Sequence, residues 1–197
     1  MTDDGSEHRV SPRALVGAEA LAALAVPARF AILNHLLSAG PRTASQCADV
    51  VGESASNCSW HLRALAKAGL VEPAPAAGDD ARTRPWQATA VGFDFSGDDG
   101  PAARIARTAL AGTAAQHADA LFHRYLARRE LLPAEWTAAP DMSDYALELT
   151  PDELRDLLGA VDALIRPYVR PIRTAAPEGS AVVHVTLRAF LDPDVLS

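Results

Sequence analysis

The sequence predicts an α+β protein that is mainly helical, and three observations lead to this prediction. Of its 197 residues, 49% are hydrophobic and 22% are charged, which is enough apolar material to bury a core. Apolar residues recur at helical spacing in several segments, which Gly and Pro separate. Runs that alternate apolar and polar residues predict a few strands after residue 70. The length and a Gly/Asp-rich linker around residues 97–100 favour two units, residues 11–95 and 100–197.

Three short helices are expected at the start of the first unit. Pro27 separates the first two, because proline disfavours helix in the residue before it but fits the first helical turn. The pair Gly40-Pro41 ends the second helix. The pattern from Thr43 to Gln46 is a capping box, which predicts a third helix that ends at Gly52.

A fourth helix and a hairpin complete the first unit. Either Ser54 or Ser56 caps this helix, which ends at Gly69. A strand, a loop rich in Pro, Ala, Gly and Asp, and a returning strand follow up to about residue 91. Arg82 and Arg84 lie at the far edge of that loop.

The second unit is predicted to hold a long helix and then a small strand-helix-strand unit. The long helix covers residues 101–132, and the strands cover residues 145–149 and 182–189. Between the strands, Thr150-Pro151-Asp152-Glu153 is a strong helix start, and Pro171 is expected to end that helix. The apolar stripe of the long helix consists of Leu110, Ala114, His117, Leu121 and Tyr125. The buried face expected for the shorter helix consists of Leu154, Leu157, Val161, Leu164, Ile165 and Tyr168.

Composition excludes several classes of protein. No stretch approaches the roughly 18 uncharged apolar residues of a membrane helix, and the first residues are acidic, so we expect a cytoplasmic protein without a membrane partner. Cys47 and Cys58 are too few for a disulfide scaffold, a four-thiolate zinc site or an iron-sulfur cluster. Common phosphate-loop, serine-hydrolase and zinc-protease motifs are missing, so we predict no catalytic residue and no cofactor.

The third and fourth helices, with the hairpin behind them, predict a winged helix-turn-helix, whose second helix enters the major groove of DNA. On a helical wheel of residues 53–67, one side is apolar and is expected to pack on the domain: Ala55, Cys58, Leu62 and Leu65. The opposite side holds Ser56, Trp60, Arg63 and Lys67, flanked by Asn57 and Ala64.

These outward residue types suit a duplex. Arg63 and Asn57 can read guanine and adenine edges, and Lys67 near the helix end fits a phosphate. Cations on an outward face are common, but a large exposed aromatic such as Trp60 usually has a partner that covers it. Arg82 and Arg84 are expected to reach phosphates or a minor groove, although the neighbouring aspartates weaken their field. The net charge of −7 matters less here than where the cations cluster.

Three segments resemble the arsenical-repressor-like (ArsR-type) winged-helix regulators: ALAVPARFAILNHLL, TASQCADVV and SWHLRALAKAGLV. The resemblance extends from residue 11 to about residue 93. It implies a homodimeric repressor that binds double-stranded DNA at an inverted repeat. It also implies operator contacts by Ser59, Trp60 and Arg63. His61 falls at the edge of the buried side, where a structural or phosphate-contacting role is favoured over a ligand role.

The sequence departs from the metal-sensing members of that family. They carry a Cys-x-Cys type pair in the third helix, where this chain has Cys47 alone. His117 and His123 are six residues apart on one helix and therefore cannot bind one ion from one face, which leaves only a site shared between two chains. We therefore predict no metal and expect a small organic effector bound in the second unit. Trp136, Tyr145, Tyr168 and Phe190 are candidate walls, with ordinary packing as the alternative for each.

Three other functions stay open at this point. The winged helix can be a protein-interaction module that has lost DNA and uses Trp60 as an anchor. Cys47 and Cys58 can form a redox switch if the two packed helices bring them within reach, although buried thiols are generally inert. An enzyme is the least favoured class.

Overall fold

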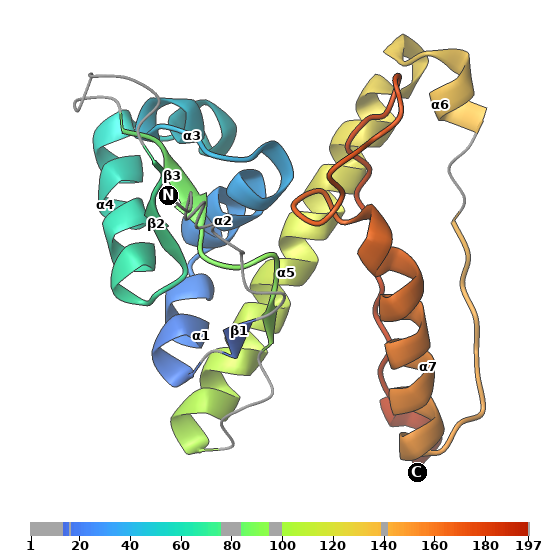
Figure 1. Cartoon of the computed structure of the whole chain (residues 1–197). Coiled ribbons are helices and arrows are strands. Elements are labelled where there is room, and N and C mark those ends of the chain that lie inside the picture. Colours follow the sequence, from blue (N-terminus) through green and yellow to red (C-terminus); the bar gives the residue numbers. More distant parts are fainter. Residues whose placement is uncertain (1–13, 16, 76–83, 95–99, 139–141, 197) are drawn as a thin grey trace, which may run out of the picture.

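A computed structural model of the chain describes residues 14–15, 17–75, 84–94, 100–138 and 142–196. The first half contains β1 (Ala14–Leu15), α1 (Ala18–Leu24), α2 (Pro27–Ala39), α3 (Ala44–Val51), α4 (Ala55–Lys67), β2 (Val71–Pro73), β3 (Trp86–Ala88) and β4 (Phe93–Asp94). The second half contains α5 (Pro101–Arg128), η2 (Arg129–Leu131), α6 (Ala134–Ala138), α7 (Pro151–Ile165), η3 (Arg166–Tyr168) and η4 (Pro193–Leu196). This mainly helical arrangement with a small antiparallel hairpin confirms the α+β winged-helix class (Figure 1).

The starts of the helices follow the capping signals. Thr43 Oγ1 accepts a hydrogen bond from the Gln46 backbone N–H at 3.3 Å, and Gln46 accepts one in return from the Thr43 N–H at 2.9 Å. Ser54, rather than Ser56, caps α4 by accepting from the Asn57 N–H at 3.2 Å. Gly52 joins α3 to α4 with a φ of 71°, a left-handed conformation that suits glycine. Both helices of the motif therefore begin where predicted, and α3 ends before Gly52 as predicted, whereas α4 ends at Lys67, two residues before Gly69.

The wing is a short antiparallel pair. β2 and β3 align Val71 with Ala88 and Pro73 with Trp86, and Arg42 extends the pairing by a bridge to Trp86. The sequence did not predict the parallel pair of β1 and β4, because two residues are too few to show a period.

One core holds the first half together and reaches onto α5. Its fully buried side chains are Leu21, Leu24, Ile32, Cys47, Cys58, Leu62, Leu65 and Leu70. On α5, Ala103 and Leu110 are buried in the same cluster. Thr113 Oγ1 donates to the Ala25 carbonyl at 2.9 Å, so the first part of α5 is attached to the end of α1 (Figure 1). Of the stripe predicted for this helix, Leu110 is buried, and the four residues from Ala114 to Tyr125 are half-buried.

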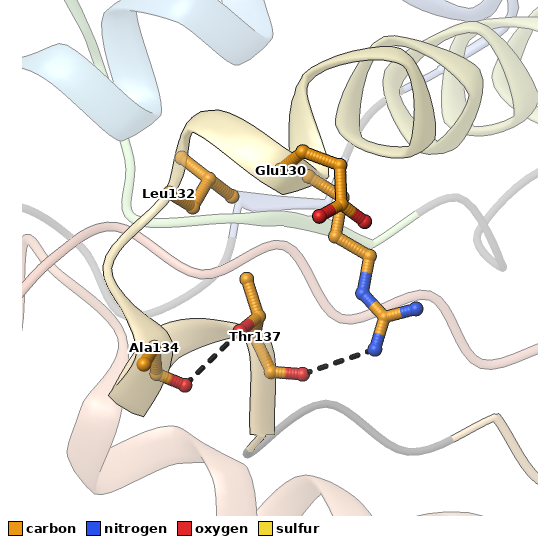
Figure 2. Close-up of a pocket in the computed structure, with 5 residues that line it drawn as sticks. Glu130, Leu132, Ala134 and Thr137 are labelled. Carbon is orange, nitrogen blue, oxygen red and sulfur yellow. Dashed lines mark hydrogen bonds between the residues drawn. The ribbon is translucent and has the colours of Figure 1, made fainter.

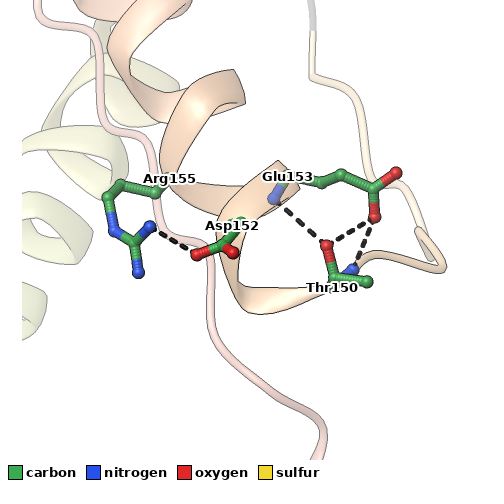
Figure 3. A network of polar contacts seen from close by, with 4 residues as sticks. All are labelled: Thr150, Asp152, Glu153 and Arg155. Carbon is green, nitrogen blue, oxygen red and sulfur yellow. Dashed lines mark hydrogen bonds and ion pairs between the residues drawn. The ribbon is translucent and has the colours of Figure 1, made fainter.

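The helix predicted after residue 150 is present as α7 and has a complete capping box (Figure 3). Thr150 accepts from the Glu153 N–H at 3.2 Å, and a Glu153 carboxylate oxygen accepts from the Thr150 N–H and hydroxyl, each at 2.8 Å. These hydrogen bonds hold the pKa of Glu153 below its ordinary value. Arg155 and Asp152 form an exposed ion pair beside the cap, at 2.6 Å.

Three predictions for the second half are wrong. Residues 145–149 and 182–189 form no strand in the described structure, because alternation builds a strand only where a second edge completes the hydrogen-bond ladder. Helix α7 stops before Pro167 instead of Pro171, because proline disfavours helix in the residue before it. Its expected apolar face is not buried either, since every residue of α7 is described and none is buried.

No single helix among the described residues is long and apolar enough to cross a membrane. Within these residues, only α1 and α2 taken together reach that length and apolar character, and the two helices are bent by 95° relative to each other.

Replacing Leu62 by alanine tests the core under α4. Leu62 is fully buried, so Leu62→Ala should lower the free energy of unfolding by about 2–5 kcal/mol through lost burial and a cavity. Urea denaturation followed by circular dichroism measures this change. The control is Ile105→Ala on α5, where the side chain is 74% exposed, and it should change the value by less than about 0.5 kcal/mol. Equal effects of the two changes would contradict the described core.

Candidate nucleic-acid interface

Helix α4 has one buried and one exposed side, as the wheel predicts. Cys58, Leu62 and Leu65 are fully buried against the domain. The exposed residues are Ser56, Asn57, Trp60, Arg63 and Lys67, while Ser59 and Ala64 are half-buried. Ala55, which was predicted to pack inward, is exposed, because it lies in the first turn, beyond the reach of the core. The helix occupies the outside of the domain, on the side away from α5 (Figure 1).

Two hydroxyls of this helix have different surroundings. Ser59 Oγ donates to the Ala55 carbonyl at 2.9 Å, so its proton is already used within the helix. Ser56 is exposed near the start of α4. Of the two, Ser56 is therefore the hydroxyl more open to a ligand, whereas the family resemblance had indicated Ser59.

Trp60 lies exposed but not isolated. Its side chain is 57% exposed, the Arg29 guanidinium carbon lies 5.0 Å from its ring centroid, and the His61 ring meets it edge to face at 5.1 Å. Arg29 comes from α2. The sequence reasoning missed Arg29 because no local pattern shows that α2 and α4 bring these two side chains together.

His61 has a structural position. It is 8% exposed, and its Nε2 lies 3.1 Å from a carboxylate oxygen of Glu53. That contact ties the middle of α4 to the turn before it. The other ring nitrogen, Nδ1, is buried without a hydrogen-bond partner in the part of the chain that the structure describes.

The wing contributes one described cation. Arg84 is exposed, and its Nε donates to the Ala74 carbonyl at 3.5 Å. Gln87 donates to the Glu72 carboxylate at 2.9 Å across the hairpin. Arg82 and the aspartates beside it lie outside the described residues.

Both cysteines are fully buried free thiols. Burial raises the pKa of Cys47 to about 11, with a smaller contribution from Cys58. Burial also raises the pKa of Cys58, and the Glu53 carboxylate adds to this shift. Because the thiolate is the reactive form, both groups are poorly suited to redox sensing.

The histidines of α5 have protein partners. The His117 ring packs edge to face on Phe30 at 5.4 Å, and burial, followed by Arg124 and His184, lowers its pKa. His123 Nδ1 lies 2.7 Å from the Asp119 carbonyl, and Asp119 forms an ion pair with Arg188 at 2.7 Å. In the ranges that the structure describes, His, Cys, Asp and Glu side chains form no group of three suited to a metal.

None of the predicted effector walls is buried. Tyr145, Tyr168 and Phe190 are each more than two-thirds exposed, and Trp136 is half-buried. A hollow of about 390 Å³ lies instead at the turn between α5 and α6, lined by Arg129, Glu130, Leu132, Ala134 and Thr137 (Figure 2). Arg129 donates across it to the Thr137 carbonyl at 3.3 Å, and Thr137 Oγ1 donates to the Ala134 carbonyl at 3.0 Å (Figure 2).

One comparison with known proteins supports the helix-turn-helix of the first half. A family model described as a helix-turn-helix domain matches residues 24–74. A solved structure of a MarR-family regulator from Neisseria meningitidis is 17% identical and covers 74% of this chain and 77% of its own. Its TM-score of 0.31 is too low to argue a shared overall fold. No curated protein matches the chain.

The matched domain, the wing and the exposed side of α4 define the class of this protein. Its first half is a winged helix-turn-helix domain, which supports a DNA-binding transcription regulator.

Thiol titration tests the description of the cysteines. With the pKa of Cys47 near 11, less than about one thiol in a hundred is ionised near pH 8. A chromogenic disulfide reagent should therefore leave both native thiols unmodified at about pH 8, and should modify both in denaturant. Fast reaction of either native thiol would contradict this description and favour a redox switch.

Proposed function

We propose that this protein is a sequence-specific transcriptional repressor of the ArsR-like type, which binds an inverted repeat in double-stranded DNA as a homodimer in the cytoplasm. The observation that carries the proposal is the exposed side of α4, on which Trp60, Arg63 and Lys67 stand opposite three fully buried residues. A helix anchored in this way can enter a major groove without losing its place in the domain.

The residues of the interface have separate roles in this proposal. Arg63 and Asn57 contact base edges from the middle and the start of α4, and Trp60 covers a thymine methyl or a sugar between them. Lys67 and the wing residues Arg82 and Arg84 bind phosphates, which positions the helix without reading sequence. Ser56 and Ser59 add contacts at the start of the helix.

The second half supports self-association. No residue of α7, which is described throughout, is buried. Large apolar side chains stand exposed along residues 142–149 and 182–191. Large exposed apolar surfaces of this kind mark a protein interface. In a homodimer, the two alternating segments of one copy would pair with those of the other copy and so form strands that are missing in the single chain.

Regulation in this proposal is a population shift. A small organic ligand that binds the second half differently in the DNA-competent and incompetent arrangements changes operator affinity by that difference. The attachment of α5 to α1 gives the second half a rigid connection to the DNA-binding domain. The buried thiols make a redox signal a weaker alternative.

A protein-interaction module is the second candidate function. The net charge of −7 and the exposed Trp60 favour it. The salt dependence of binding distinguishes the two candidate functions. Affinity for DNA should fall steeply as ionic strength rises, whereas affinity for a protein partner anchored by an aromatic ring should depend on salt only weakly.

Two variants of α4 test the proposed roles. Sites are first selected from random duplex DNA with the wild-type protein, and affinities are then measured by fluorescence anisotropy. Arg63→Ala should lose about 1–3 kcal/mol of discrimination at one base pair. Lys67→Ala should lower the affinity for all DNA sequences by a similar factor. It should also reduce the slope of log affinity against log salt concentration by about one. Wild-type affinity and selectivity in both variants would reject this side of α4 as the interface.

Charged substitutions in the second half test the homodimer. Leu164 on α7 is 74% exposed, so Leu164→Glu should leave the fold of one chain intact but weaken self-association at least tenfold, because it places a charge in an apolar interface. Sedimentation equilibrium measures this change. Val50→Glu on α3, at a half-exposed apolar position, is the control and should remain dimeric. A monomeric wild-type protein would contradict the proposed homodimer.

A further inference from the structure

Arg29 lies next to the proposed interface without being part of the recognition helix. It is the third residue of α2, and its guanidinium carbon lies 5.0 Å from the centroid of the Trp60 ring. The side chain is half-buried. It therefore places a permanent positive charge against the one large aromatic group on the exposed side of α4.

The hydrogen bonds of Arg29 are incomplete in the free protein. Its Nε is buried and has no hydrogen-bond partner in the described ranges. Burying a donor without an acceptor is unfavourable, and contact with an aromatic face does not replace the missing acceptor. Because the side chain as a whole is only half-buried, a phosphate that arrives from outside would bind the terminal nitrogens of the guanidinium and not the buried Nε.

Contacts on several sides also fix the Trp60 ring. Arg29 lies over it, and the edge-to-face contact with His61 adds a second neighbour. Glu53 holds His61 from the turn before α4, at 3.1 Å. The position of the exposed indole thus depends on one residue of α2 and on the contact between His61 and Glu53.

We propose that Arg29 binds a backbone phosphate of the operator while its planar side holds Trp60 in place for the bases. This inference rests on the proposed DNA binding, and adds α2 to the interface. A guanidinium suits both tasks because it stacks through its plane and donates through its edge, whereas an ammonium group does not stack in this way. Arg29 is therefore a phosphate contact and a positioning residue for Trp60.

Three variants separate the two tasks. Arg29→Met removes the charge and should reduce the slope of log affinity against log salt by about 0.9, the change expected for one phosphate contact. Arg29→Lys keeps the charge and should restore most of the slope, but not the base selectivity that depends on Trp60. Arg155→Met, on α7 and outside the DNA-binding domain, is the control and should leave both quantities unchanged.

Operator duplexes with a single neutral methylphosphonate identify the phosphate. Wild-type protein should lose affinity at one position of each half-site where Arg29→Met loses none, because the variant no longer contacts that phosphate. Thermal unfolding of each variant shows whether it is folded. A stable Arg29→Met variant with the wild-type slope and the same sensitivity at every position would overturn this inference alone. If the wild-type protein selects no DNA at all, the proposed function fails and the inference fails with it.

Discussion

The structure depends above all on the burial of one side of α4. Cys58, Leu62 and Leu65 are fully buried against the domain, and the period of the helix then determines which residues face outward. Rotating α4 to bury Trp60 or Arg63 would expose these three side chains to water, which the hydrophobic effect opposes. The same constraint explains the position of His61, which lies at the border of the buried side and contacts Glu53 in the preceding turn. The arrangement of the exposed residues is therefore a consequence of packing.

The two halves of the chain meet this requirement for burial to different degrees. The first half encloses its apolar residues in one core, which extends to Ala103 and Leu110 of α5. Beyond that point the exposed apolar residues increase, and α7 buries none of its side chains in the single chain that the structure describes. Helix α5 joins the two halves, since its first part packs on α1 and its later part carries the Asp119 contact with Arg188.

Local signals made elements in both halves predictable. The capping boxes at Thr43 and Thr150, the proline at position 27 and the alternation near residue 71 each depend on neighbours in sequence, and all four elements are present. Features that depend on a partner distant in sequence were predicted wrongly or not at all. Residues 182–189 alternate like a strand, but the described chain offers them no edge, and Arg29 meets Trp60 only because α2 and α4 pack together. The exposed side of α4 was predictable because the apolar residues of the helix identify its buried side and the other residues must then face outward. The contacts that those outward residues make were not predictable from the sequence.

An acidic protein can present a surface suited to DNA because charges act locally. The net charge is −7, yet α4 contains no acidic residue and carries Arg63 and Lys67 on its exposed side. Among the nearby carboxylates, Glu53 is in contact with His61 and Glu72 with Gln87, so both have partners within the domain. The acidic residues of α7 lie on the other side of α5 from α4 (Figure 1). At physiological salt, charges separated by more than about 8 Å of solvent are largely screened. The electrostatic field at the exposed side of α4 is therefore set by the neighbouring cations, including Arg29 over Trp60, rather than by the net charge of the chain.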